Sequence, residues 1–235
     1  MVKRKIGLLP ASGSASRLNG IPKFALPYNS EITLIEWHVQ LMLEVVDEVR
    51  ICSRASWVPL LKELGIDQLV SIISLEPSTM NDALFHLANL NGKEKDADYI
   101  VGMPDTVLVQ AQGNPYEKLS STSGAVSLLA TPFREELRGK VGQLKFSSSN
   151  LVEEIKDKDP KCNYGAIWSA FRMSGYPLER EDKSPSYSFQ RMLESGDIVL
   201  AVESEGEYFD LGSLTGLKEY YSLPTTHFLS KTKEM

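Results

Sequence analysis

The chain contains 235 residues, of which 42% are hydrophobic, and it carries a formal net charge of −6. This length is sufficient for one α/β domain, and no apolar run reaches the roughly 18 residues that a membrane span requires. The negative charge argues against a general nucleic-acid binder, whose affinity comes mainly from cations that neutralise phosphates.

The two cysteines, Cys52 and Cys162, stand far apart in the sequence. They form no CxxC pattern and no histidine lies at ligand spacing, so the sequence indicates neither a disulfide framework nor a zinc site. The first residues, MVKRKIGLLPAS, begin like a signal peptide, but their apolar segment of about five residues is too short for one. We therefore expect a cytoplasmic protein that begins with a strand and has neither a membrane nor a nucleic acid as partner.

Short apolar runs and helix-like apolar spacing alternate through the first half of the chain. The expected strands are 5–11, 49–52, 69–74 and 99–103, and the expected helices are 34–46, 58–64 and 79–91. Alternation of this kind predicts parallel strands covered by helices.

After Asp105 the strand candidates follow one another with few helices between them. The expected strands are 125–130, 143–146, 151–156, 165–173 and 198–202, and the expected helices are 184–195 and 214–221, the second capped by Ser213. We predict an α/β fold in which helices flank a mixed, mostly parallel central sheet. A smaller lobe of mixed strands is expected in the second half.

The stretch GLLPASGSASRLNGIPKFALP, residues 7–27, places a loop of small residues directly after the first predicted strand. Its backbone N–H groups suit a phosphate, and its only cations, Arg17 and Lys23, suit the charge of that phosphate. Neither GxxxxGK[ST] nor GxGxxG is present. Taken singly, each cation is more typical of a solvated surface loop.

Two carboxylates, Asp105 and Asp210, stand at the carboxyl ends of predicted strands, the edge of an open α/β sheet where ligands bind. Mg²⁺ prefers one or two carboxylates together with phosphate oxygens and water, so this pair is a candidate metal site. The alternative is structural: Asp105 begins a turn, and Asp210 caps the helix that starts near Ser213.

Several segments in order resemble the signature of the nucleotidylyltransferases, above all those that activate sugar 1-phosphates. Residues 11–18 (ASGSASRL) and 22–27 (PKFALP) are similar to the family's AGGxGxRL…PKxLxP. The further similarities are TMNDAL at 79–84 to GTAxAL, MPD at 103–105 to the GD motif, VEEIKDKD at 152–159 to VxxIxEKP, YGAI at 164–167 to NxGIY, and FDLGS at 209–213 to FDxGT.

The resemblance implies a single Rossmann-like nucleotidyltransferase domain over residues 1–235, with a nucleotide-binding half at 1–110 and a sugar-phosphate-binding half at 111–235. It implies transfer of NMP from a nucleoside triphosphate to a sugar 1-phosphate, with release of pyrophosphate, as in nucleotide-sugar biosynthesis. Mg²⁺ is the implied cofactor. The implied catalytic residues are Arg17, Lys23, Asp105 and Asp210, and the last two would also hold the metal.

The resemblance also assigns binding residues to both halves. The nucleotide-binding residues it implies are Pro10, Ala11, Ser12, Gly13, Thr79, Asn81 and Asp82, and the sugar-phosphate-binding residues are Lys158, Tyr164 and Gly165. Asn81 and Asp82 equally suit the start of a helix after Thr79, and the charge run around Lys158 is more typical of a solvated edge.

The chain departs from the family pattern at Ser12 and Ala15, which replace glycines and are expected to narrow the loop, and at Pro104, which replaces the glycine before Asp105. Two other functions stay open. One is a cytidylyltransferase of the methylerythritol or acidic-sugar type, whose loop is also rich in small residues and followed by PK. The other is a nucleotide-binding regulatory protein without turnover, which the loss of the glycines favours. The sequence leaves the base, the sugar and the oligomeric state open.

Overall fold

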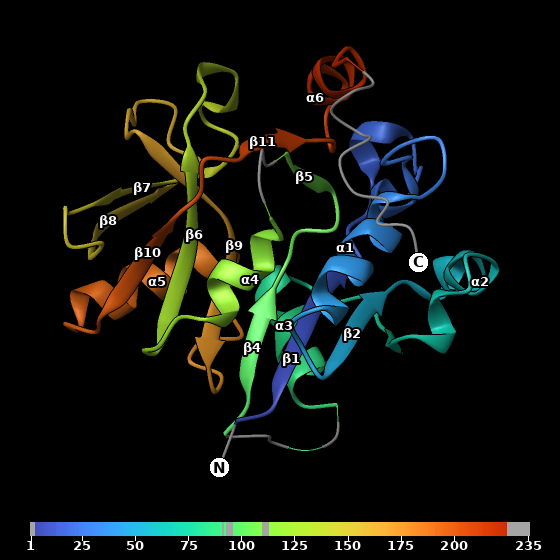
Figure 1. The fold of residues 1–235 in the computed structure, drawn as a ribbon, viewed down its shortest axis with the longest axis horizontal. Coiled ribbons are helices and arrows are strands. Elements are labelled where there is room, and N and C mark those ends of the chain that lie inside the picture. The colour runs from blue at the N-terminus through green and yellow to red at the C-terminus, as the bar shows by residue number, and fades with distance from the viewer. Residues whose placement is uncertain (1–2, 91, 93–95, 110–112, 225–235) are drawn as a thin grey trace.

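A nine-stranded sheet forms the centre of the computed structural model, which describes residues 3–90, 92, 96–109 and 113–224 (Figure 1). Seven strands lie in the order β10-β6-β9-β4-β1-β2-β3, and β7 and β8 extend the sheet beside β9. The strands are β1 (Lys5–Ala11), β2 (Glu48–Ser53), β3 (Ser71–Ser74), β4 (Asp98–Val101), β6 (Val126–Pro132), β7 (Gly142–Phe146), β8 (Val152–Asp157), β9 (Ala166–Ser174) and β10 (Val199–Glu203).

The strands β3, β2, β1 and β4 run parallel, as the alternation of the first half predicted. Strand β1 pairs on both sides, with Leu8 opposite Arg50 of β2 and Val101 of β4. Because neighbouring residues of a strand point to opposite faces, Leu8 enters one hydrophobic core and Leu9 the other. A strand covered on both faces explains the continuous apolar run in the sequence.

The second half of the chain joins the same sheet. Strand β9 lies antiparallel between β4 and β6, β10 lies parallel to β6, and the hairpin of β7 and β8 is attached to β9. In Figure 1 these strands gather on the left of the view, away from β2 and α2. The mixed, mostly parallel sheet with a mixed-strand second half confirms the predicted fold class.

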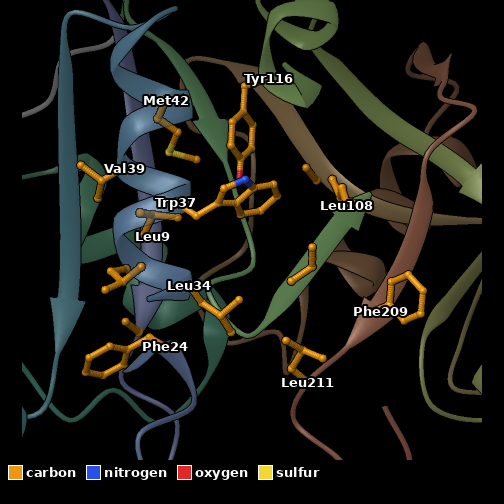
Figure 2. Packing of buried hydrophobic residues seen from close by; sticks show 14 of the residues in the cluster. Leu9, Phe24, Leu34, Trp37, Val39, Met42, Leu108, Tyr116, Phe209 and Leu211 are labelled. Carbon is orange, nitrogen blue, oxygen red and sulfur yellow. The ribbon is translucent and has the colours of Figure 1, made fainter. Parts of the chain in front are cut away.

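Helices cover both faces of the sheet. The helices of the described residues are α1 (Leu34–Leu43), α2 (Val58–Glu63), α3 (Met80–Ala88), α4 (Pro115–Ser120), α5 (Pro185–Glu194) and α6 (Leu214–Tyr221), of which α6 packs against β11 of a separate small sheet. Side chains of α1 and α4 pack in one core with Leu9, Phe24 and Phe209 (Figure 2), whereas α3 and α5 belong to the core on the other face. Among the described residues, no helix has both the length and the apolar character of a membrane span.

Side-chain caps fix the starts of several helices. Thr33 and Glu36 form a capping box at α1, Thr79 accepts from the backbone N–H of Asp82 at α3, and Ser213 accepts from that of Gly216 at α6. The cap predicted at Ser213 is confirmed. The helices predicted over 34–46 and 79–91 both end earlier, at Leu43 and at Ala88.

A separate two-stranded sheet pairs β5 (Thr106–Val109) with β11 (Glu207–Asp210), antiparallel, with Thr106 opposite Asp210. The strand at 106–109, the strand at 207–210 and α4 were not among the predicted elements. Each is short, and the two strands pair across a long stretch of sequence, so no local pattern indicated their pairing. This small sheet brings the two candidate metal ligands to one place.

Candidate functional site

A cavity of about 330 Å³ opens beyond the carboxyl end of β1. Both halves of the chain contribute to its wall, and the predicted residues Pro10, Ala11, Gly13, Arg17, Lys23, Asp105, Lys158 and Asp210 all line it. The site therefore lies at the sheet edge where open α/β proteins bind ligands.

The loop after β1 starts at Ser12, whose carbonyl accepts a hydrogen bond from Nε of Arg54 at 2.9 Å. Arg54 follows β2 directly, so the neighbouring strand supports the loop. No local pattern indicated this support, because the contact depends on the parallel pairing of β1 and β2. Further along, Arg17 lies exposed in a short 3-10 helix at Ser16–Leu18, and Lys23 begins a second one at Lys23–Ala25.

Ala15 adopts the left-handed backbone conformation, with φ of 50°, that glycine ordinarily supplies. Its side chain is 4% exposed, and neither Ala15 nor Ser12 is among the residues that line the cavity. The expectation that their side-chain carbons narrow the loop is therefore not met. The chain keeps a glycine-like backbone turn while it buries the extra methyl group.

Lys23 and Asp105 form the central ion pair of the site, with 2.8 Å between Nζ and Oδ2. Asp210 lies beside them, because a Cβ added to Gly212 would stand 2.5 Å from Lys23 Nζ and 2.8 Å from Asp210 Oδ1. Gly212 thus gives room for an ammonium and a carboxylate to approach the backbone. The FDLGS motif contains this glycine, but its spacing alone did not indicate that the position requires one.

Pairing of β5 with β11 brings Asp105 and Asp210 together. The Leu211 N–H donates to the Asp105 carbonyl at 3.0 Å, and the Gly212 N–H donates to Asp210 Oδ1 at 2.8 Å. The structural alternative for Asp210 is not realised, since the cap of α6 is Ser213. Asp105 does lie in a turn at 104–105, as its structural alternative expected, and both aspartates line the cavity.

Burial raises the pKa of Asp210 above its ordinary value, and the neighbouring charge of Asp105 raises it further. Two close carboxylates in a partly buried place favour a bound cation. Within the described part of the chain no group of three or more His, Cys, Asp or Glu residues could hold a metal ion. A two-carboxylate site nevertheless fits Mg²⁺, which takes its remaining ligands from phosphates and water.

The predicted residues of α3 occupy another position. Thr79 caps the helix and donates to the Arg180 carbonyl at 3.3 Å, and the Asn81 amide donates to the Glu179 carbonyl at 2.8 Å. Asp82 pairs with Arg180, with 2.6 Å between Oδ1 and Nε. These three residues fasten α3 to the 179–180 segment and do not line the cavity, whereas Met80 does.

Lys158 lines the opposite wall of the cavity. Its backbone φ is 52°, a rare conformation for a residue other than glycine, and its N–H donates to the Val141 carbonyl at 3.1 Å. Trp168 lies nearby, and its Nε1 donates to Ser186 Oγ at 3.0 Å. Gly142 leaves space for that ring, because an added Cβ would lie 2.2 Å from Trp168 Nε1.

Tyr164 and Gly165 do not line the cavity. A hydrogen bond to Glu154 raises the pKa of Tyr164 to about 12. Residues that the sequence analysis missed take part in the wall instead, namely Lys140, Gly142, Asp157, Ser184 and Tyr208. These residues come from separate segments that form no common sequence motif, so only the folded structure brings them together.

A larger cavity, of about 540 Å³, lies between α3 and residues 176–181. It contains none of the predicted site residues. Three of its polar side chains have partners within the protein: Tyr99 donates to the Ala88 carbonyl, Tyr176 donates to the Asn81 carbonyl, and Arg180 pairs with Asp82. The predicted site residues that line a cavity all lie in the smaller one.

Solved structures match this arrangement over almost the whole chain. A UTP-bound UGPase from Acinetobacter baumannii is 19% identical with a TM-score of 0.74, covering 98% of this chain and 95% of that chain. A UDP-glucose pyrophosphorylase complexed with UDP-glucose is 16% identical with a TM-score of 0.74, covering 93% and 97%. The inositol-1-phosphate CTP transferase from T. maritima is 15% identical with a TM-score of 0.69, covering 94% and 95%.

These similarities establish the fold, which is the one that the sequence resemblance implied, that of the sugar-phosphate nucleotidylyltransferases. No protein-family model matches the chain, and a comparison with curated proteins finds no match.

Proposed function

We propose that this protein is a nucleotidylyltransferase that transfers NMP from a nucleoside triphosphate to a sugar 1-phosphate. The observation that carries the proposal is the Lys23–Asp105 ion pair beside Asp210, in a cavity that Arg17 also lines. Cations and carboxylates in one cavity suit the handling of a triphosphate. Similar structures that are UTP-bound or complexed with UDP-glucose support this assignment.

In the proposed reaction, an anionic oxygen of the sugar phosphate attacks the α-phosphorus. A phosphorus–oxygen bond forms there while the bond to the bridging α,β oxygen breaks, and pyrophosphate leaves with that electron pair. The attacking oxygen is already a nucleophile, so no protein base is required. Catalysis then consists of alignment and charge neutralisation.

The residues of the site divide these tasks. Arg17 holds the β,γ-phosphates that depart, and Lys23 neutralises the α-phosphate and the attacking group. Asp105 and Asp210 would hold Mg²⁺, which supplies charge neutralisation of the triphosphate when it is bound. Lys158 and Trp168, on the opposite wall, border the acceptor.

Pyrophosphate release tests the proposal directly. The full chain is assayed with UTP, dTTP, CTP, ATP and GTP, each with glucose 1-phosphate and a panel of other acceptors, including inositol 1-phosphate, methylerythritol 4-phosphate and acidic sugars. We expect release that requires Mg²⁺, one triphosphate and one sugar 1-phosphate together. Release only with CTP and methylerythritol 4-phosphate or an acidic sugar would favour the cytidylyltransferase alternative. Triphosphate binding without release would favour the regulatory one.

Lys23→Ala provides the matched test of mechanism. Loss of one preorganised charge at the reacting phosphorus lowers turnover by about a hundredfold or more, and the KM for the sugar phosphate should change far less. Lys62→Ala, at an exposed position of α2, is the control and should leave both parameters at the parent values. An unchanged turnover number in Lys23→Ala would remove Lys23 from the mechanism.

A further inference from the structure

A hydrogen-bonded chain of polar groups is buried behind the carboxylates and takes no part in the reaction described above. His38 of α1 is 1% exposed and lies between two partners. Its Nε2 is 2.9 Å from the carbonyl oxygen of Thr106, and its Nδ1 is 2.5 Å from the hydroxyl of Tyr116 in α4. Figure 2 shows Tyr116 reaching from α4 toward α1.

The chemistry of these partners fixes the direction of both bonds. A carbonyl oxygen can only accept, so His38 Nε2 carries the hydrogen and donates to Thr106. Nδ1 then accepts from the Tyr116 hydroxyl. Burial lowers the pKa of His38 to about 4, so that the imidazole is neutral at pH 7 and has one donor and one acceptor.

Thr106 and Tyr116, the two partners of His38, both contact the turn that carries Asp105. The N–H and the hydroxyl of Thr106 donate to the Met103 carbonyl at 3.1 and 2.9 Å, which closes the turn. On its other side, a Cβ added to Gly102 would lie 2.3 Å from the Tyr116 hydroxyl, so Tyr116 packs directly on the start of this segment. His38 and Tyr116 therefore contact the chain on both sides of residues 103–105.

The same turn also sets the position of Asp210. Thr106 stands opposite Asp210 in the β5–β11 pair, and the Asp105 carbonyl accepts from the Leu211 N–H. The two carboxylates lie on different segments, which the pairing of β5 with β11 joins. A shift of the Thr106 backbone would therefore move both of them.

We propose that His38, oriented by Tyr116, is a positioning residue that holds Asp105 and Asp210 at the separation needed to bind a divalent cation. The inference rests on the proposed function for the role of the two carboxylates. His38 touches neither substrate nor metal and acts through the Thr106 carbonyl.

Three variants separate this role from simple packing. His38→Leu fills the space but removes the donor, and Tyr116→Phe keeps the ring but removes the hydroxyl that orients the imidazole. His38→Gln retains an N–H donor near the position of Nε2 and should rescue much of the loss. Tyr99→Phe is the matched control, because it removes a buried tyrosine hydroxyl that donates to the Ala88 carbonyl on the other face of the sheet.

The first measurement is Mn²⁺ titration followed by electron paramagnetic resonance, which needs no turnover. We expect His38→Leu to weaken Mn²⁺ binding by about tenfold, the lower end of the cost of removing groups that orient metal ligands. Tyr116→Phe should weaken it less, and His38→Gln and Tyr99→Phe should stay near the parent. In the assay for pyrophosphate release, His38→Leu should lower kcat while the KM for the sugar phosphate stays within about twofold.

Hydrogen exchange measured by mass spectrometry gives a second readout that depends on neither metal nor activity. In His38→Leu and Tyr116→Phe, exchange should become faster in peptides covering 103–109 and 207–212 and stay unchanged in β2 and β9. Parent-like exchange in both segments, together with parent-like Mn²⁺ affinity in folded His38→Leu, would overturn the proposal. If the parent bound Mn²⁺ but transferred no nucleotide, the proposed function would fail while the positioning role stood. If the parent bound no Mn²⁺, the metal-binding role would fail, whatever the exchange data showed.

Discussion

Asp210 carries a partly buried carboxyl group next to that of Asp105, an arrangement that suits cation binding and disfavours the charged form in the unliganded fold. Burial and the neighbouring charge both raise its pKa. A carboxyl group whose folded pKa is raised destabilises the fold as the pH rises, because the unfolded chain releases the proton first. The proposed metal-binding role of Asp210 therefore opposes stability.

We predict that Asp210→Asn is more stable than the parent at pH 7 although it loses metal-dependent activity. The free energies of unfolding of the two proteins should coincide near pH 3, where Asp210 is protonated in both states. The two free energies should separate as the pH rises above about 3.9, the ordinary pKa of an aspartate in the unfolded chain. The difference should stop growing once the pH passes the raised pKa of Asp210 in the folded protein. Urea unfolding between pH 3 and pH 8 measures this difference. A parent that gained stability over Asp210→Asn with rising pH would contradict the assigned environment.

At Gly212 we predict that a single methyl group is sufficient to disrupt the site. The Cβ of Gly212→Ala would meet Lys23 Nζ and Asp210 Oδ1, so the ammonium must move from its place beside the carboxylates. We expect turnover to fall about tenfold or more while the far-ultraviolet circular dichroism stays unchanged. If the loss acts through Lys23, adding Gly212→Ala to Lys23→Ala should cost little more, and full additivity would show that Gly212 acts independently.

At the scale of elements, the loop after β1 contributes to the cavity wall although it lacks the glycines of the pattern that it resembles. The backbone at Ala15 turns with a positive φ, and the buried methyl group lies in the protein and not in the cavity. The strain of that conformation, on the order of 1 kcal/mol, is offset within the surrounding packing.

We predict that Ala15→Gly changes the free energy of unfolding by less than about 1 kcal/mol, because relief of the left-handed strain offsets the lost contacts and the more flexible unfolded chain. Triphosphate affinity, measured by calorimetry, should be kept or improved. Ala83→Gly in α3 is the control, where the same loss of a buried methyl group at an ordinary helical conformation should cost more, about 1 kcal/mol or above. Collapse of triphosphate binding in Ala15→Gly would mean that the methyl group itself shapes the site.

At the scale of the molecule, β9 joins the two halves of the chain by lying between β4 and β6. A buried ion pair crosses the junction from β4 to β9, with Arg172 Nη2 2.6 Å from Asp98 Oδ2, and Arg172 Nη1 also donates to the Gly124 carbonyl at 2.7 Å. The halves 1–110 and 111–235 thus share one sheet, and we expect them to unfold together.

Arg172→Met should therefore destabilise the whole molecule, by about 3–5 kcal/mol, because it leaves the carboxylate of Asp98 without its main buried partner. Tryptophan fluorescence and circular dichroism should still report one common unfolding transition. Lys145→Ala removes an exposed ion pair with Glu153 and should cost less than about 1 kcal/mol. Equal effects of the two variants would contradict the structural role of the buried pair.

Local patterns of the sequence determined most of the elements and part of the site. The buried run at 5–11, the alternation that follows it and the cap at Ser213 each depend on neighbours within a few residues, so spacing alone indicated them. The loop cations Arg17 and Lys23 were found in the same way and do line the cavity.

Only the tertiary structure decided what depends on distant segments. The pairing of β5 with β11, which joins Asp105 to Asp210, and the contact of His38 with Thr106 each link residues far apart in the chain. The attachment of Thr79, Asn81 and Asp82 to residues 179 and 180 does the same. Burial and packing of the whole chain decide which remote strands pair, in which register, and which segment each helix face contacts. A local sequence pattern does not contain this information.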